Sequence, residues 1–212
     1  YVNKYITEFY LVDMFYRKTL EAYHDLITKE NPIEHMLNVA KRQMDQEYAK
    51  VANLLNLEWL TCVEEKGAWF TETGLKHQEE FYANESDPNV KQVIIISDAL
   101  RYEVAMELMQ KLAKEKNMAS IEAYQAMLPT ETKFCKLSLL PHHSLELIGT
   151  DMAVDGTVLA TTEQRTVHLD KYCEGGVCVR YEDVMNGDQI STRELFKRPL
   201  VYIFHDTIDE AS

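Results

Sequence analysis

One short stretch constrains the fold more than any other part of this chain. Residues 90–97 are rich in the β-branched residues Val and Ile, with Val93 to Ile96 as an apolar run, and Asp98 follows directly. A β-branched run of this length is typical of a central strand that is buried on both faces. Ligands of open α/β sheets bind just beyond the carboxyl ends of such strands. The run therefore predicts an α/β domain with Asp98 at its ligand-binding edge.

The part of the chain before this strand predicts helices. Apolar and aromatic residues recur at the spacing of one helix face from Tyr1 to Tyr23, and Asn31-Pro32 breaks the pattern. A second helix is expected from about Ile33 toward Trp59, and a third over 73–82. The polar cluster 84–89 indicates a linker. We therefore expect a helical region at 1–83.

The remainder alternates strands with helices. We expect a helix over 102–116, a strand over 120–128, helices over 133–140, 161–172 and near Val184, and a strand over 199–204. This order favours a mostly parallel sheet with flanking helices, which is an α/β fold. The second predicted domain covers 90–212. Residues 141–198 are long and polar, and the sequence assigns them no role.

Composition limits the functional classes. The chain carries 35 Asp and Glu against 22 Lys and Arg, a net charge of −13. DNA-binding surfaces gain affinity from cations that displace phosphate counterions, so direct DNA binding by this acidic chain is not expected. No apolar run approaches the roughly 20 residues of a membrane span, and nothing resembles a secretion signal. We expect a cytoplasmic protein without membrane contact, and the lack of an initiator methionine suggests a longer parent chain.

The four cysteines leave two alternatives open. Cys173 and Cys178 frame a Gly-Gly turn at a spacing that could supply half of a zinc site, but no second pair follows. The alternative is that all four are reduced thiols of a cytosolic protein.

Two further segments carry candidate chemistry. Thr130 and Thr132 follow the second predicted strand where a helix opens, so a hydroxyl there either caps the helix or serves as a metal-activated nucleophile. Neighbouring strands would bring it beside Asp98, which is itself either a metal ligand or the N-cap of the next helix. His205 follows the last strand and is either a ligand, a group that supports one, or structural. Arg101 could hold phosphate or pair with Glu103.

Three segments together resemble a known family. Residues 95–103 (IISDALRYE), 128–132 (LPTET) and 201–209 (VYIFHDTID) are similar to three successive signatures of the PglZ domain. That domain belongs to the alkaline phosphatase superfamily and occurs in bacterial phage-defence systems of the BREX type. The resemblance covers about residues 80–209 and implies an alkaline-phosphatase-like core that is incomplete here.

The resemblance also implies roles for single residues. Asp98 would be a metal ligand, Thr132 the nucleophile, and Asp209 the first Asp of a later metal-binding motif. Thr130, Arg101 and His205 would contact phosphate or support the ligands. It implies two divalent cations, Zn²⁺ foremost. Because further ligands would lie beyond residue 212, we expect this chain to be weakly active or inactive and to hold little metal.

The resemblance implies a phosphatase or phosphodiesterase acting on a phosphoester, nucleotides or nucleic acid included. Its partners would be other phage-defence subunits, including a DNA methyltransferase. The alternative function is a non-catalytic scaffold that binds that methyltransferase.

Overall fold

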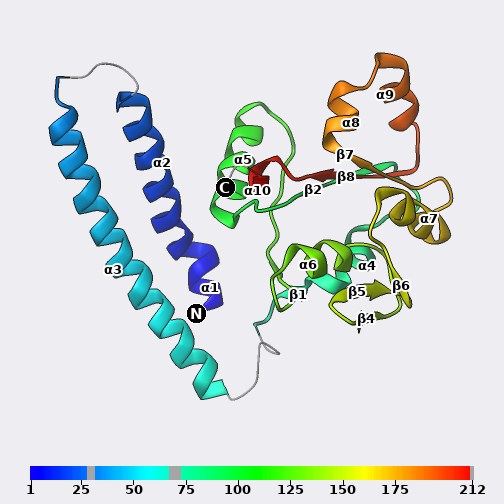
Figure 1. Cartoon of the computed structure of the whole chain (residues 1–212), viewed down its shortest axis with the longest axis horizontal. Helices are drawn as coiled ribbons and strands as arrows, with labels where there is room; N and C mark the ends of the chain where they lie inside the picture. The colour runs from blue at the N-terminus through cyan, green and yellow to red at the C-terminus, as the bar shows by residue number, and fades with distance from the viewer. Residues whose placement is uncertain (28–31, 67–72, 211–212) are drawn as a thin grey trace. The chain divides into compact units, whose positions relative to one another are not determined.

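The computed structural model describes residues 1–27, 32–66 and 73–210, with the side chains of 209 and 210 excepted. The chain forms two compact units (Figure 1). A helical unit contains Tyr1–Gly74 and Arg101–Ala123, and an α/β unit contains Leu75–Leu100 and Tyr124–Ser212. The helix that follows the first long strand is thus grouped with the N-terminal helices. The division into domains at 1–83 and 90–212 stays a prediction.

The helical unit confirms the first two predicted helices. Its elements are α1 (Val2–Lys4), the π-helical turn η1 (Tyr5–Phe9), α2 (Tyr10–Ile27), α3 (Glu34–Lys66) and α5 (Tyr102–Lys114). The predicted break falls partly on Asn31, which lies outside the described residues. The helix predicted over 73–82 is wrong. That region contains the short strand β1 (Lys76–His77), the 3-10 turn η2 (Gln78–Glu80) and α4 (Phe81–Glu85).

A buried ion pair joins α2 to α5 within the helical unit. Glu103 is only 1% exposed, and Nε of Arg17 lies 3.1 Å from its Oε2. Nη2 of the same guanidinium lies 2.7 Å from Oε2 of Glu107. A buried carboxylate is costly without such a partner. Glu103 therefore pairs with Arg17, and the alternative pairing with Arg101 is wrong.

The α/β unit is built on a parallel sheet of strand order β2-β8-β7. The strands are β2 (Gln92–Ser97), β7 (Val177–Arg180) and β8 (Leu200–His205). Their parallel pairing confirms the predicted fold class. The strand predicted over 120–128 is reduced to β3 (Tyr124–Gln125), which pairs with β1 in a separate sheet. Strand β7 lies in the polar stretch 141–198, where the sequence predicted none.

The same polar stretch contributes an antiparallel meander and several helices. The meander is β4 (Leu145–Ile148), β5 (Asp151–Val154) and β6 (Thr157–Val158). Besides α4, the helices of this unit are α6 (Thr132–Ser138), α7 (Thr162–Tyr172), α8 (Tyr181–Asn186), α9 (Gln189–Leu195) and α10 (Thr207–Glu210). Local sequence explains two of their starts. Thr161 and Gln164 form a capping box at α7, and Asp188 caps α9 by accepting bonds from two backbone amides.

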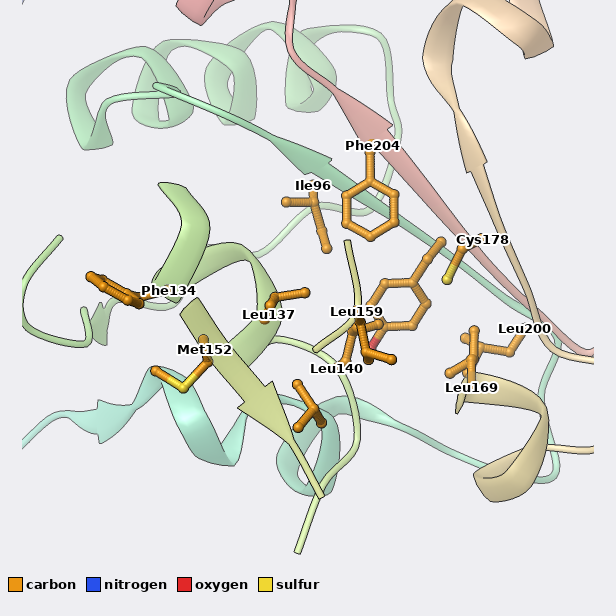
Figure 2. Close-up of a cluster of buried hydrophobic side chains, with 12 residues drawn as sticks. Ile96, Phe134, Leu137, Leu140, Met152, Leu159, Leu169, Cys178, Leu200 and Phe204 are labelled. Carbon is orange, nitrogen blue, oxygen red and sulfur yellow. The ribbon is translucent and has the colours of Figure 1, made fainter. Parts of the chain in front are cut away.

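The main core lies between one face of the sheet and the elements that pack on it, α6, α7 and β5 (Figure 2). Ile96, Tyr202 and Phe204 come from the sheet, and Leu137 and Leu169 come from the helices. All are at most 9% exposed. The core therefore fixes α6 against the ends of β2 and β8.

The prediction that β2 is buried on both faces is wrong. Val93 and Ile95 are 49% and 61% exposed, whereas Val201 and Ile203 beside them on β8 are 0% and 4% exposed. The reason is topological, because β2 is an edge strand of this sheet and β8 is its centre. Among the described residues, no helix is both long and apolar enough to cross a membrane.

The paired valines allow a matched stability test. Val201→Ala should lower the free energy of unfolding by about 2 kcal/mol, because it removes buried methyl groups from the central strand and leaves a cavity. Val93→Ala at the register partner should cost less than about 1 kcal/mol, because that side chain is half exposed. Urea unfolding of both variants measures the difference. Equal losses of unfolding free energy in the two variants would contradict the exposure of Val93 on β2.

Three hydrogen bonds to Asp155, called the Asp155 lock below, hold the turn between β5 and β6 of the meander. The backbone amides of His143 and Ser144 donate to Oδ1 of Asp155, at 2.8 and 2.9 Å, and the Tyr172 hydroxyl donates to Oδ2. Burial raises the pKa of this carboxyl, but the three hydrogen bonds outweigh it and lower the pKa to about 2. The ionised form is therefore favoured by the fold.

This lock predicts a pH dependence. Folding lowers the pKa of Asp155 from 3.8 to about 2, so the ionised carboxylate adds to the free energy of unfolding. This contribution is complete above about pH 4 and is lost as the pH falls toward 2. The difference in free energy of unfolding between the wild type and Asp155→Asn should therefore shrink as the pH falls from about 4 toward 2. Denaturant unfolding at several pH values measures it, with Asp151→Asn at the exposed first residue of β5 as the control. A gap that stays constant from pH 6 to 2 would contradict the lock.

Candidate functional site

The carboxyl ends of β2 and β8 lie side by side. Ser97 and His205 are register partners, and the backbone amide of Asp98 donates to the carbonyl of His205 at 2.9 Å. Ala99 then adopts a left-handed conformation (φ 59°), and its amide donates to Oδ1 of Asp98 at 3.0 Å. The chain therefore turns sharply and holds the carboxylate at the sheet edge. The N-cap of α5 is Arg101, so the N-cap alternative for Asp98 is wrong.

A lysine that the sequence analysis missed joins the two strand ends. Nζ of Lys136 lies 3.2 Å from Oδ2 of Asp98 and 2.6 Å from Oδ1 of Asp206. The Lys136 side chain is 11% exposed, compared with 18% for Asp98 and 43% for Asp206. One ammonium thus compensates two carboxylates from neighbouring strand ends. The only sequence signal was a lysine in a short helix, between the apolar residues Phe134 and Leu137.

Helix α6 also carries the predicted nucleophile. Thr132 is the first residue of α6, and it is exposed. Residues four apart share a helix face, so Thr132 lies one turn from Lys136 on the same side. The N-cap of α6 is Glu131, so the capping alternative for a threonine hydroxyl is wrong. Thr130 is exposed in the preceding turn. Helix α6, rather than a neighbouring strand, links this segment to Asp98.

The pKa values of two side chains near the strand ends, Cys135 and Arg165, are shifted. Burial raises the pKa of Cys135, and the negative charge of Asp98 raises it further. Burial lowers the pKa of Arg165, which the charge of Asp206 partly offsets. The Arg165 guanidinium lies 4.8 Å from the ring centroid of Phe204. A second cation, also missed in the sequence, therefore stands near Asp206.

The remaining predicted residues are placed as follows. Nδ1 of His205 lies 2.8 Å from the Ser97 hydroxyl, and its ring meets Tyr181 edge-on at 4.6 Å, so packing fixes its orientation. Arg101 belongs to the helical unit. Asp209 lies in α10, but its side chain is outside the described residues.

Cys173 and Cys178 differ in exposure, and Cys173 packs against the core cluster that contains Cys178. The Cys178 side chain is 3% exposed in the core (Figure 2), whereas Cys173 is intermediate in exposure. Burial raises the pKa of the Cys178 thiol to about 12. All four cysteines are free of disulfide bonds. In the described ranges no group of three or more His, Cys, Asp or Glu side chains could hold a metal ion.

A family model decides the relationship. Residues 80–212 match the BREX system PglZ alkaline phosphatase-like domain. The chain belongs to the PglZ family. This match includes both strand ends, Lys136 and α6, and it confirms the family and the fold class predicted from the three signature segments.

Two curated relatives agree with this PglZ assignment. The alkaline phosphatase-like protein PglZ of Bacillus cereus (strain H3081.97) is 28% identical over 97% of this chain and 24% of its own length. The alkaline phosphatase-like protein BrxZ of Escherichia coli O9:H4 (strain HS) is 33% identical over 64% of this chain and 17% of its own length. The chain thus spans about a quarter or less of these relatives. No solved structure matches it significantly.

The burial of Cys178 predicts that its thiol is protected from alkylation in the folded PglZ chain, whereas the Cys173 thiol is not. At pH 8 iodoacetamide should modify Cys173 in the folded protein and leave Cys178 unmodified, because Cys178 is buried with a pKa of about 12. Peptide mass spectrometry before and after unfolding in urea measures both sites. Protection of both cysteines by added zinc, reversed by a chelator, would instead restore the zinc-site alternative.

Proposed function

We propose that this PglZ-family chain supplies part of the catalytic site of a metal-dependent phosphoester hydrolase. The observation that carries the proposal is the contact between Lys136 and Asp98. Through it, the helix that begins at Thr132 packs beside the strand end that holds a carboxylate. A hydroxyl nucleophile and an oxygen ligand on adjoining rigid elements are what such a site requires.

The residues at the strand ends fit a cation. Asp98 and Asp206 both direct a carboxylate oxygen at one positive charge, and carboxylate oxygens are common ligands of divalent metals. Asp98 would hold the metal, and Asp209 would add a ligand from α10. We propose two divalent ions, with Zn²⁺ foremost. When bound, they would polarise the phosphoryl group and favour the ionised hydroxyl of the nucleophile.

In the proposed reaction the Thr132 oxygen attacks phosphorus. The bond from phosphorus to the leaving oxygen breaks, and the proton lost by the Thr132 hydroxyl balances the proton that the leaving oxygen takes up to become an alcohol, so that Thr132 is transiently esterified. Attack by water then breaks the bond between phosphorus and the Thr132 oxygen, which regains a proton from the water, and releases phosphate from a monoester or a phosphate monoester from a diester. Thr130, His205 and Arg101 are proposed to contact phosphate or to orient the ligands, with the Arg101 guanidinium suited to two phosphate oxygens.

The substrate class is a phosphoester, either a monoester or a diester of a nucleotide or nucleic acid. The net charge of −13 argues against direct DNA binding by this chain, so a nucleic-acid substrate would be presented by other subunits. We propose that the whole protein is cytoplasmic and works with other BREX subunits, including a DNA methyltransferase.

One observation favours a second candidate, a non-catalytic scaffold that binds the methyltransferase. Lys136 already compensates Asp98 and Asp206, and the described side chains include no cluster of three metal ligands. A domain in this state could keep the fold without turnover.

Two substitutions separate the candidates. In the full-length protein with Zn²⁺, Asp98→Ala and Thr132→Ala should each lower kcat for a phosphoester by at least about a hundredfold, because each removes several kcal/mol of transition-state stabilisation. Release of p-nitrophenol from mono- and diester substrates measures the rates.

Matched controls keep this result interpretable. Thr132→Ser retains a hydroxyl and should retain measurable turnover, and Lys133→Met on the exposed side of α6 should leave the rate unchanged. A wild-type rate that equals the rates of both alanine variants would contradict the hydrolase and favour the scaffold.

A further inference from the structure

Helix α6 places the positive charge of Lys136 at the strand ends. Phe134, Leu137 and Ser138 are buried at 8%, 6% and 0% exposure and anchor the helix in the core. Lys136 stands between these anchors, and its side chain is 11% exposed. These anchors hold the backbone of Lys136 beside the strand ends, and its flexible side chain reaches both carboxylates from there.

The two carboxylates depend on this charge. Oxygens of Asp98 and Asp206 lie within 3.2 Å of the same nitrogen, so the two negative charges are themselves close neighbours. Like charges this close repel unless a cation compensates them. Arg165 contributes positive charge near Asp206, but its Nε donates to the Leu159 carbonyl at 3.2 Å, so Lys136 is the group that bridges the pair.

We propose that Lys136 is a positioning residue that serves as an internal cation, holding Asp98 and Asp206 together until a divalent cation displaces it. This inference rests on the proposed function, because it takes Asp98 to be a metal ligand. The ammonium and the metal would compete for the same oxygens. Replacing Lys136 by an uncharged residue should therefore tighten metal binding, even though the substitution also removes the ion pairs of Lys136 with Asp98 and Asp206.

The magnitude follows from electrostatics. At an effective dielectric constant near 20, an ammonium about 5 Å from a divalent cation weakens the binding of that cation by several orders of magnitude, and salt screening reduces this effect. We expect Lys136→Met to bind Zn²⁺ at least about tenfold more tightly than the wild type. Lys136→Arg keeps the charge and should stay close to the wild type.

The test is isothermal titration of the full-length, metal-stripped protein with Zn²⁺. The variants are Lys136→Met, Lys136→Arg and Asp98→Ala, with Lys133→Met as the matched control. Lys133 is on the same helix, is 47% exposed and pairs with Glu131 instead. Circular dichroism melting in EDTA checks that each variant is folded, and Lys136→Gln replaces Lys136→Met if the latter does not fold.

The outcomes are distinct. Tighter binding in Lys136→Met alone, with binding lost in Asp98→Ala, supports the internal cation. Equal or weaker binding in Lys136→Met, while Asp98→Ala still loses the metal, overturns this inference and leaves the proposed function standing. Absence of binding in every protein, or binding that Asp98→Ala does not alter, overturns both.

Discussion

The parallel pairing of β2 with β8 is the constraint on which the rest of the α/β unit depends. It runs from Gln92 beside Leu200 to Ser97 beside His205, and the amide of Asp98 extends it by one bond. Because parallel strands end at the same edge, this register alone brings Asp98 and Asp206 together. The buried face of the same two strands seats α6, which adds Lys136 and begins at Thr132.

Charge balance then determines whether the carboxylates at the ends of β2 and β8 can lie close together. Two carboxylates at neighbouring strand ends are tolerated because one ammonium contacts both. The same arrangement suits a cation, so the charge balance links the fold to the proposed chemistry. In the helical unit Arg17 does a comparable task for the buried Glu103, although it joins helices and stands at no strand end.

The sequence predicted those parts that depend on local pattern. The apolar run before Asp98, the last strand and the helix beginning at Thr132 were all visible as periodicity and turn residues. It failed where partners far along the chain decide the structure. Val93 and Ile95 look like core residues, but among the described strands β2 pairs with β8 alone. Lys136 has no pattern of its own, and its role depends on carboxylates 38 residues before it and 70 residues after it in the numbering.

The most direct test of the account is the position of a bound metal in the full-length protein. Crystals grown with Zn²⁺ and measured at the zinc absorption edge would show each ion by its anomalous scattering. The account predicts an ion at bonding distance, about 2.0–2.2 Å, from a carboxylate oxygen of Asp98, with the Lys136 ammonium moved away from it. Zinc bound only at other residues, with Lys136 still paired to Asp98, would contradict the account.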